Sequence, residues 1–215
     1  MRYKAVIFDL DGTLLDTLDD LADAMNDALR KVGVAIHPVD KYKLMVGNGI
    51  RNLVKRALPA DRQDLFDKAL ATMCENYAKN AFNKTKIIDG ILKTLQKLRE
   101  ENIKLAVLTN KDQNFSVHII EHYFGNKMFE LIWGAMPGRP IKPDPVALIE
   151  LLAKLNVKPY DAVFVGDSGI DMDVAATAGV SSIGVTWGFR GREELMEHHA
   201  GIIIAKPEEI LSHLA

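Results

Sequence analysis

The chain has 215 residues, of which 48% are apolar, enough for a folded core in one domain with an insertion or in two small domains. The formal net charge of −2 gives no electrostatic basis for binding nucleic acid or an anionic membrane surface. No run approaches the roughly 18 apolar residues of a spanning helix, and the single cysteine, Cys74, excludes an intrachain disulfide and a cysteine-based zinc site. Because no signal-peptide pattern precedes the first apolar run, we expect a cytoplasmic protein.

The first predicted strand, residues 5–8, has the branched and aromatic content of a strand buried on both faces. Asp9 and Asp11 follow it, one residue apart, so their carboxylates can point the same way. Such a pair is tolerated where a divalent cation lies between the carboxylates or where one of them is protonated. Gly12 allows a tight turn beside a ligand, and Thr13 offers a hydroxyl and an N–H to an anion. An ordinary Asx-type turn has the same composition.

Residues 17–82 show helical periodicity and no strand pattern, with helices expected over 17–33, 39–46, 50–58 and 62–80. A block of helices between the first strand and the next strand pattern is typical of an inserted domain. We therefore predict an α/β core domain from residues 1–16 and 83–215 and a helical cap domain from residues 17–82. Because the insertion leaves and rejoins the core beside Asp9, it can cover a site there as a lid.

Within this cap, Gly47 and Asn48 lie in a loop between two predicted helices, and Arg51 follows the loop. We predict that these three residues contact the substrate when the cap closes. A plain helix–helix connection, with glycines at the helix ends, would explain the same residues without any function.

After residue 82 strands and helices alternate. Strands are expected over 104–108, 131–133, 162–165 and 183–185, and helices over 91–102, 113–123, 145–155 and 171–178, with 202–204 and 208–214 as the last elements. Parallel strands with right-handed helical crossovers predict an α/β fold with a doubly wound, Rossmann-like parallel sheet in three layers. In such a sheet ligands bind beyond the carboxyl ends of the strands.

Polar side chains recur at the ends of these later strands. Thr109, Asn110 and Lys111 follow the strand at 104–108. They supply a hydroxyl, an amide and an ammonium that could all bind an anion at the start of the next helix. A helix N-cap cluster is the simpler alternative.

A second pair of carboxylates, Asp167 and Asp171, follows the strand at 162–165 in a glycine-containing loop. Oxygen ligands of this kind suit magnesium, which usually takes one or two carboxylates and keeps water and phosphate oxygens as its other ligands. The alternative is a turn followed by an Asp-capped helix. Lys142 lies between the two strands among prolines that fix the path of its loop, as a lysine at a site requires, although prolines also start helices.

In order and position these motifs resemble the four motifs of the haloacid dehalogenase-like hydrolases. The matching motifs are Asp9 through Thr13, Thr109, Lys142, and Gly166-Asp167 through Asp171. The resemblance covers nearly the whole chain, including a helical cap inserted after the first motif. Within the superfamily, residues 8–17 and the cap segment 46–58 look most like phosphoglycolate phosphatases.

The resemblance implies a role for each matching residue. In the implied site Asp9 is the nucleophile, Asp11 is the general acid and base, and Thr109, Lys142, Asn110, Gly12 and Thr13 bind the phosphoryl group. The implied cofactor is Mg²⁺. Its implied ligands are the Asp9 carboxylate, the Asp11 backbone carbonyl and Asp167, with Asp171 either a further ligand or an orienting group.

The implied function is Mg²⁺-dependent hydrolysis of a small phosphorylated metabolite, foremost 2-phosphoglycolate, through an aspartyl-phosphate. Related cap-bearing members act on pyrophosphate, sugar phosphates or nucleotides, and a phosphomutase would keep every core residue. A dehalogenase needs neither magnesium nor a general acid, so Asp11 and Asp167 argue against one. A non-catalytic protein that binds a phosphometabolite is a more distant alternative. We expect a monomer or homodimer with no nucleic-acid or membrane partner.

Two further groups of residues stand outside these motifs. His118 and His122 are one helical turn apart, but without a further ligand nearby we interpret them as a surface pair. Trp187 through Gly191 follow a predicted strand. This segment could reach the rim of the site or simply pack over the edge of the sheet.

Overall fold

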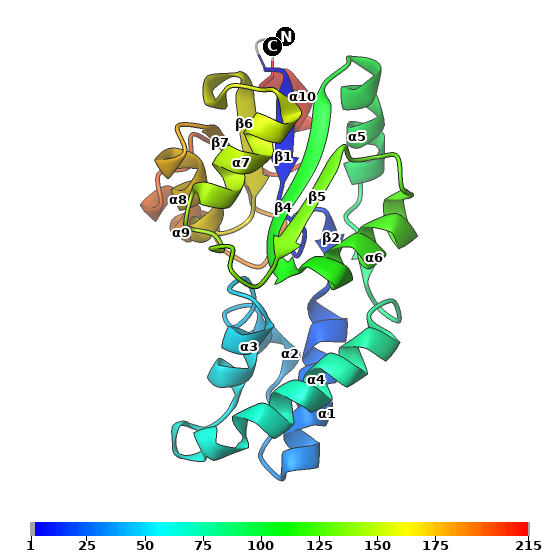
Figure 1. Ribbon diagram of the computed structural model, residues 1–215, viewed down its shortest axis with the longest axis vertical. Coiled ribbons are helices and arrows are strands. Elements are labelled where there is room, and N and C mark those ends of the chain that lie inside the picture. Colours follow the sequence, from blue (N-terminus) through cyan, green and yellow to red (C-terminus); the bar gives the residue numbers. More distant parts are fainter. Residues whose placement is uncertain (1–2, 215) are drawn as a thin grey trace.

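The computed structural model describes residues 3–214, so Met1, Arg2 and Ala215 lie outside the described residues. Its main sheet has six strands, all parallel, in the order β5-β4-β1-β6-β7-β8 (Figure 1). They are β1 (Ala5–Phe8), β4 (Lys104–Asp112), β5 (Leu131–Ala135), β6 (Ala162–Gly166), β7 (Ser181–Val185) and β8 (Ile202–Ile204). The predicted doubly wound α/β fold is confirmed.

Helices cover both faces of this sheet. They are α5 (Ile91–Glu100), α6 (Gln113–Phe124), α7 (Val146–Leu155), α8 (Gly169–Thr177), α9 (Arg192–Glu197) and α10 (Glu209–Ser212), with a short 3-10 helix, η2 (Pro159–Asp161). The side chains of the buried strand β1 alternate between the two faces. Val6 and Phe8 pack with residues of α5 and α6, whereas Ala5 and Ile7 pack with residues of α7 and α8.

The register of the central strands fixes where the site can form. Phe8 pairs with Val107 on β4 and with Val165 on β6. The residues that follow these three positions therefore meet at the same edge of the sheet, which is the carboxyl edge.

A helical insertion follows β1 and lies beyond this edge (Figure 1). It consists of α1 (Leu18–Val32), α2 (Val39–Tyr42), α3 (Ile50–Ala57), a 3-10 helix η1 (Ala60–Leu65) and α4 (Phe66–Asn80). These helices enclose a hydrophobic cluster of their own, distinct from the two that flank the sheet. A short antiparallel pair, β2 (Leu15–Asp16) with β3 (Lys86–Ile87), lies where the chain leaves and rejoins the core. The exact domain boundaries stay a prediction.

Several elements differ from the sequence prediction in extent. Over residues 62–80, expected to be one helix, the structure has the end of η1 up to Leu65 and then α4 from Phe66; Arg62, inside η1, has a non-helical backbone (φ −121°, ψ 31°). β4 continues to Asp112, four residues beyond the expected strand end at 108, with an irregular register after Leu108. The helix expected from 171 begins at Gly169. β2 and β3 were not predicted, because strands of two residues are too short to show periodicity.

No helix within residues 3–214 is long and apolar enough to cross a membrane.

Asp20 joins the two ends of the helical insertion. This α1 residue is 2% exposed, and its carboxylate accepts hydrogen bonds from the backbone N–H groups of Lys84 and Thr85 at 2.8–3.0 Å. The start of the insertion is thereby tied to the segment that returns to the core.

We expect Asp20→Ala to lower the free energy of unfolding by about 2–3 kcal/mol, because buried backbone donors lose a charged acceptor. Urea denaturation measures the change. The matched control is Asp23→Ala, which removes only an exposed ion pair with the same lysine, Lys84. Equal effects of the two substitutions would contradict the role assigned to Asp20.

Candidate active site

Three buried carboxylates meet at the carboxyl edge of the sheet. Asp9 follows β1, Asp167 follows β6, and Asp171 lies in the first turn of α8. Each presents one oxygen, and these oxygens all lie within 4.8 Å of one another. The predicted gathering of the first and last motifs is therefore present in the structure.

Lys142 supplies the positive charge of this cluster. Its buried ammonium lies 2.8 Å from Asp9 Oδ1 and 2.6 Å from Asp171 Oδ1. Burial raises the pKa of Asp9, Lys142 opposes the rise and the negative charge of Asp171 adds to it, so that the pKa is about 6.

Asp171 is fully engaged by its neighbours. Its Oδ1 accepts from Lys142 Nζ, and its Oδ2 accepts from the N–H and the hydroxyl of Ser168 at 3.1 and 2.7 Å. The bond from the Ser168 N–H is one half of a capping box at the start of α8; in the other half the Ser168 side chain accepts from the backbone N–H of Asp171. The arrangement holds Asp171 where it orients the lysine.

The carboxylate cluster fits a hard divalent cation. Burial, together with the negative charges of Asp171 and Asp9, raises the pKa of Asp167 well above its usual range. Asp9 Oδ1 is buried and has no aligned hydrogen-bond donor among the described residues, although Lys142 is close. A Mg²⁺ ion would relieve the repulsion among the three carboxylates, since its preferred ligands are carboxylate and carbonyl oxygens.

Asp11 lies at the side of the cluster that faces the helical insertion. The ammonium of Lys111 lies 3.0 and 3.2 Å from its two oxygens, and Thr17 Oγ1 donates a hydrogen bond of 2.8 Å to Oδ1. The sequence prediction grouped Lys111 with anion-binding residues and missed its pairing with Asp11, which is 100 residues away in sequence. No local pattern connects the two.

The other predicted phosphoryl-binding residues, Thr109, Thr13 and Gly12, differ in whether their polar groups already have hydrogen-bond partners within the protein. Thr109 is buried, and its hydroxyl accepts a hydrogen bond of 3.3 Å from Lys111 N. The Thr13 hydroxyl is buried without a hydrogen-bond partner among the described residues, whereas the Thr13 N–H donates to Leu10 O. Gly12 has φ +84°, a conformation that favours glycine.

Asn110 connects the helical insertion to the loop that carries Lys142. Its Nδ2 donates to the carbonyl oxygens of Gly47 and Lys142, both at 3.0 Å, and its Oδ1 accepts from Lys142 N at 2.9 Å. The amide predicted to bind substrate is thus occupied by backbone groups that set the closed position of the insertion.

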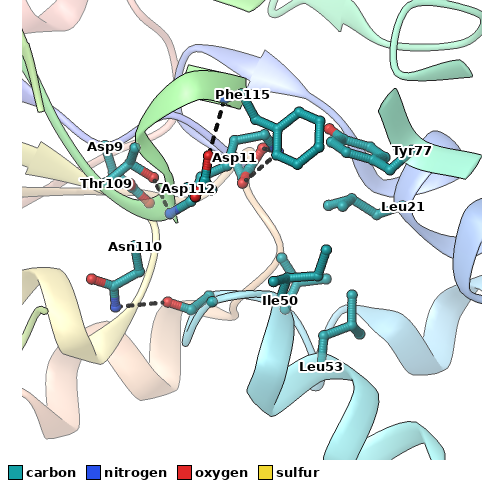
Figure 2. Close-up of a pocket in the computed structure, with 14 residues that line it drawn as sticks. Asp9, Asp11, Leu21, Ile50, Leu53, Tyr77, Thr109, Asn110, Asp112 and Phe115 are labelled. Atoms are coloured by element: carbon teal, nitrogen blue, oxygen red, sulfur yellow. Dashed lines mark hydrogen bonds and ion pairs between the residues drawn. The ribbon is translucent and has the colours of Figure 1, made fainter. Parts of the chain in front are cut away.

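A cavity of about 40 Å³ lies between the insertion and the sheet edge (Figure 2). Its lining residues are Asp9, Asp11, Leu21, Val46, Gly47, Gly49, Ile50, Leu53, Tyr77, Thr109, Asn110, Lys111, Asp112 and Phe115. A water molecule in the liquid takes about 30 Å³, so the insertion is closed over the site. Of the predicted cap contacts, Gly47 lines this cavity but Asn48 and Arg51 do not; the Arg51 guanidinium lies 5.0 Å from the Phe66 ring centroid.

The segment from Trp187 to Arg190 also reaches the site, which decides between its two interpretations. Trp187 Nε1 donates to Thr13 O at 3.1 Å, and Phe189 N donates to Asp167 Oδ2 at 2.6 Å. Arg190 donates to the carbonyl of Val46 in the helical insertion at 2.9 Å. The segment supports the carboxylate cluster and holds the insertion closed.

His118 and His122 are exposed on α6, in agreement with the predicted surface pair. Their rings flank Phe82, with centroid separations of 5.2 and 4.4 Å.

Fold and site together define an α/β protein with a carboxylate and lysine centre under a helical insertion. A family model described as haloacid dehalogenase-like hydrolase matches residues 6–185. The chain belongs to this family.

Curated relatives and a solved structure extend the comparison. A phosphoglycolate phosphatase from Psychrobacter arcticus is 32% identical, covering 92% of this chain and 89% of its own length. A phosphoglycolate phosphatase from Pseudomonas putida is 35% identical, covering 86% and 70%. The crystal structure of a predicted phosphoglycolate phosphatase from Haemophilus somnus has a TM-score of 0.91 and 27% identity, covering 100% of this chain and 99% of that one.

A substitution at Gly12 tests how closely the first motif packs against Asp167. A Cβ at Gly12 would overlap the Asp167 carboxylate and come within 2.9 Å of its Cγ, whereas a Cβ at Gly33, which has a similar φ of +77°, has nothing within 4 Å. Both alanine variants incur the strain of a left-handed backbone, about 1–2 kcal/mol. We expect Gly12→Ala to lose a further ~1–3 kcal/mol of unfolding free energy in urea denaturation. Equal losses for Gly12→Ala and Gly33→Ala would show that the close contact carries no cost.

Proposed function

We propose that this protein is a Mg²⁺-dependent phosphatase that hydrolyses a small phosphorylated metabolite, foremost 2-phosphoglycolate, in the cytoplasm. The observation that carries the proposal is the buried Lys142 ammonium between Asp9 and Asp171, beside a third carboxylate. A carboxylate nucleophile, a cation for phosphoryl oxygens and oxygen ligands for a metal are what phosphoryl transfer to a protein side chain requires. The named relatives support the same chemistry.

In the proposed first step an Asp9 carboxylate oxygen forms a bond to phosphorus as the bond from phosphorus to the ester oxygen breaks. Asp11 donates its proton to that oxygen, which leaves as an alcohol. In the second step water attacks the phosphorus of the aspartyl-phosphate and Asp11 accepts a proton from it. Inorganic phosphate is released and the Asp9 carboxylate is restored.

The surrounding residues hold these groups in place. Lys142 offsets the repulsion between the Asp9 carboxylate and the incoming phosphoryl oxygens. Lys111 and Thr17 fix the direction of the Asp11 carboxyl group. The buried hydroxyl of Thr13 and the Thr109 side chain lie close enough to the first motif to bind phosphoryl oxygens, and closure of the insertion excludes bulk water.

The residues proposed to hold the metal are Asp9, Asp167 and the backbone carbonyl of Asp11. Bound there, Mg²⁺ would neutralise charge on the phosphoryl oxygens. We propose that Asp171 orients Lys142 and is not a direct ligand, because its oxygens already accept from Lys142 and Ser168.

We expect Asp9→Asn to remain folded and to lose at least about 10³-fold in turnover, because an amide cannot act as the nucleophile. The measurement is inorganic phosphate release from a panel of phosphomonoesters that includes 2-phosphoglycolate, with thermal unfolding as the check on folding. A steep preference for 2-phosphoglycolate supports the proposed substrate, and broad, slow release supports only the phosphatase. Substantial activity in Asp9→Asn would exclude Asp9 as the nucleophile.

Removal of the metal gives a separate test. We expect a chelator to abolish phosphate release and added Mg²⁺ to restore it, because the clustered carboxylates need a cation to accept a phosphoryl dianion. Isothermal titration calorimetry of Mg²⁺ against wild type and Asp167→Asn reports binding without turnover, and we expect the variant to bind at least about tenfold more weakly. Full activity in the presence of chelator would contradict the proposed metal site.

A further inference from the structure

The cavity above the cluster has an uneven distribution of charge. Its insertion side is apolar and is formed by Leu21, Val46, Ile50, Leu53 and the Tyr77 ring, with Phe115 adjacent from α6 (Figure 2). Among the described residues that line it, Lys111 is the only basic one. Lys142 is held between Asp9 and Asp171, and Arg51 is outside the cavity. An anionic group in the cavity therefore has one ammonium available to it.

Lys111 is buried and forms an ion pair with one carboxylate, that of Asp11. Its side chain is 6% exposed, two contacts join its ammonium to Asp11, and the ammonium lies 4.6 Å from the centroid of the Tyr77 ring. An aromatic face is a weaker partner for a buried ammonium than a carboxylate is. The ammonium can thus accept a second anion in place of its contact with the ring.

Among the described residues, the hydroxyl of Tyr77 next to Lys111 has no acceptor for its proton. Tyr77 is 1% exposed, and its Oη has no aligned hydrogen-bond partner among the described residues, although it interacts electrostatically with Lys111. Figure 2 shows the hydroxyl end of Tyr77 turned toward Asp11 and Phe115. Buried hydroxyl groups normally donate a hydrogen bond. This unmet donor is an independent sign that the cavity is built for a polar ligand group.

We infer that Lys111, assisted by the Tyr77 hydroxyl, binds a carboxylate carried by the leaving group and so determines substrate specificity. The substrate class is that of phosphomonoesters with a carboxylate on the carbon next to the ester oxygen. The inference rests on the proposed function, because it uses Asp11 as the group that protonates the ester oxygen.

The geometry sets this class. A general acid lies about 2.6–3.2 Å from the oxygen that it protonates, and Lys111 Nζ lies 3.0 Å from Asp11 Oδ1. The ammonium is therefore within about 6 Å of the ester oxygen, a span that a carboxylate one carbon removed can cover. The substrate carboxylate also supplies negative charge to Lys111 when Asp11 carries the proton that it donates, which matters because an unpaired buried cation is unfavourable.

The test compares 2-phosphoglycolate with ethyl phosphate, in which a methyl group replaces the carboxylate. We measure kcat/KM for both substrates with wild type, Lys111→Met and Thr17→Val, all with Mg²⁺. Thr17→Val is the matched control, because it removes the other side-chain contact of Asp11 and leaves Lys111 in place. We expect Lys111→Met to lower the ratio of the two kcat/KM values at least about 30-fold, mainly through KM. Thr17→Val should lower both values and leave their ratio unchanged.

Two further variants refine the result. We expect Lys111→Arg to retain most of the preference for the carboxylate, and Tyr77→Phe to lower the ratio about threefold, since one neutral hydrogen bond is lost. Circular dichroism and thermal unfolding confirm that each variant is folded. If Lys111→Met lowers both kcat/KM values equally, Lys111 acts only by positioning Asp11 and the inference is overturned.

A binding measurement separates this inference from the proposed function. Calorimetry of 2-phosphoglycolate and ethyl phosphate is carried out with Asp9→Asn, alone and combined with Lys111→Met. One outcome is that adding Lys111→Met weakens binding of 2-phosphoglycolate but not of ethyl phosphate, while the wild type releases no phosphate from either. This result would refute the phosphatase and retain the carboxylate subsite. If Asp9→Asn and the double variant bind each ligand with the same affinity, the subsite is refuted, whatever the wild type hydrolyses.

Discussion

The site depends on one ammonium placed among carboxylates where water is largely excluded. Lys142 contacts Asp9 and Asp171, while Asp167 lies close enough to share a cation with both. One positive charge does not balance three carboxylates, so the remaining repulsion has to be met by other groups. Ser168 and the backbone N–H of Phe189 supply hydrogen bonds, and a metal cation held by Asp9 and Asp167 would add further positive charge. The loops at this edge of the sheet therefore place hydrogen-bond donors around the excess negative charge of the carboxylates.

The closed position of the helical insertion is linked to the same centre. Two neighbouring carbonyl groups of the insertion, those of Val46 and Gly47, accept hydrogen bonds from Arg190 and Asn110 of the core. Asn110 also holds the backbone of Lys142, and the segment that carries Arg190 donates to Asp167. The cavity between the insertion and the sheet edge is about 40 Å³, so a ligand larger than a water molecule or two requires these contacts to open or the lining side chains to move. Opening the insertion therefore changes the support of both the lysine and the carboxylate cluster.

The sequence predicted the parts of this structure that have a local signal. The apolar run at residues 5–8 and the periodic helices determine the layers and order of the fold, and the polar residues after each strand identified the edge where Asp9, Lys142 and Asp167 meet. It could not predict partners far apart in the chain, such as Lys111 with Asp11 or Arg190 with Val46. These pairs depend on the register of β4 and on how the insertion rests on the core. The extension of β4 from Thr109 to Asp112 was missed, because polar residues there favour a helix cap as readily as a strand.

Core and insertion divide recognition between them. The carboxylates, Lys142 and the buried hydroxyls of the sheet edge are suited to a phosphoryl group and to a metal, and they are insensitive to what the phosphoryl group is attached to. The rest of a substrate faces mainly apolar side chains of the insertion, which discriminate weakly, since one methylene group changes binding only modestly. A single buried cation in that apolar lining discriminates much more strongly, because a ligand without a matching charge leaves it poorly paired. Lys111 occupies that position and also contacts Asp11, so in the proposed reaction recognition of the leaving group and its protonation would occur at adjacent atoms.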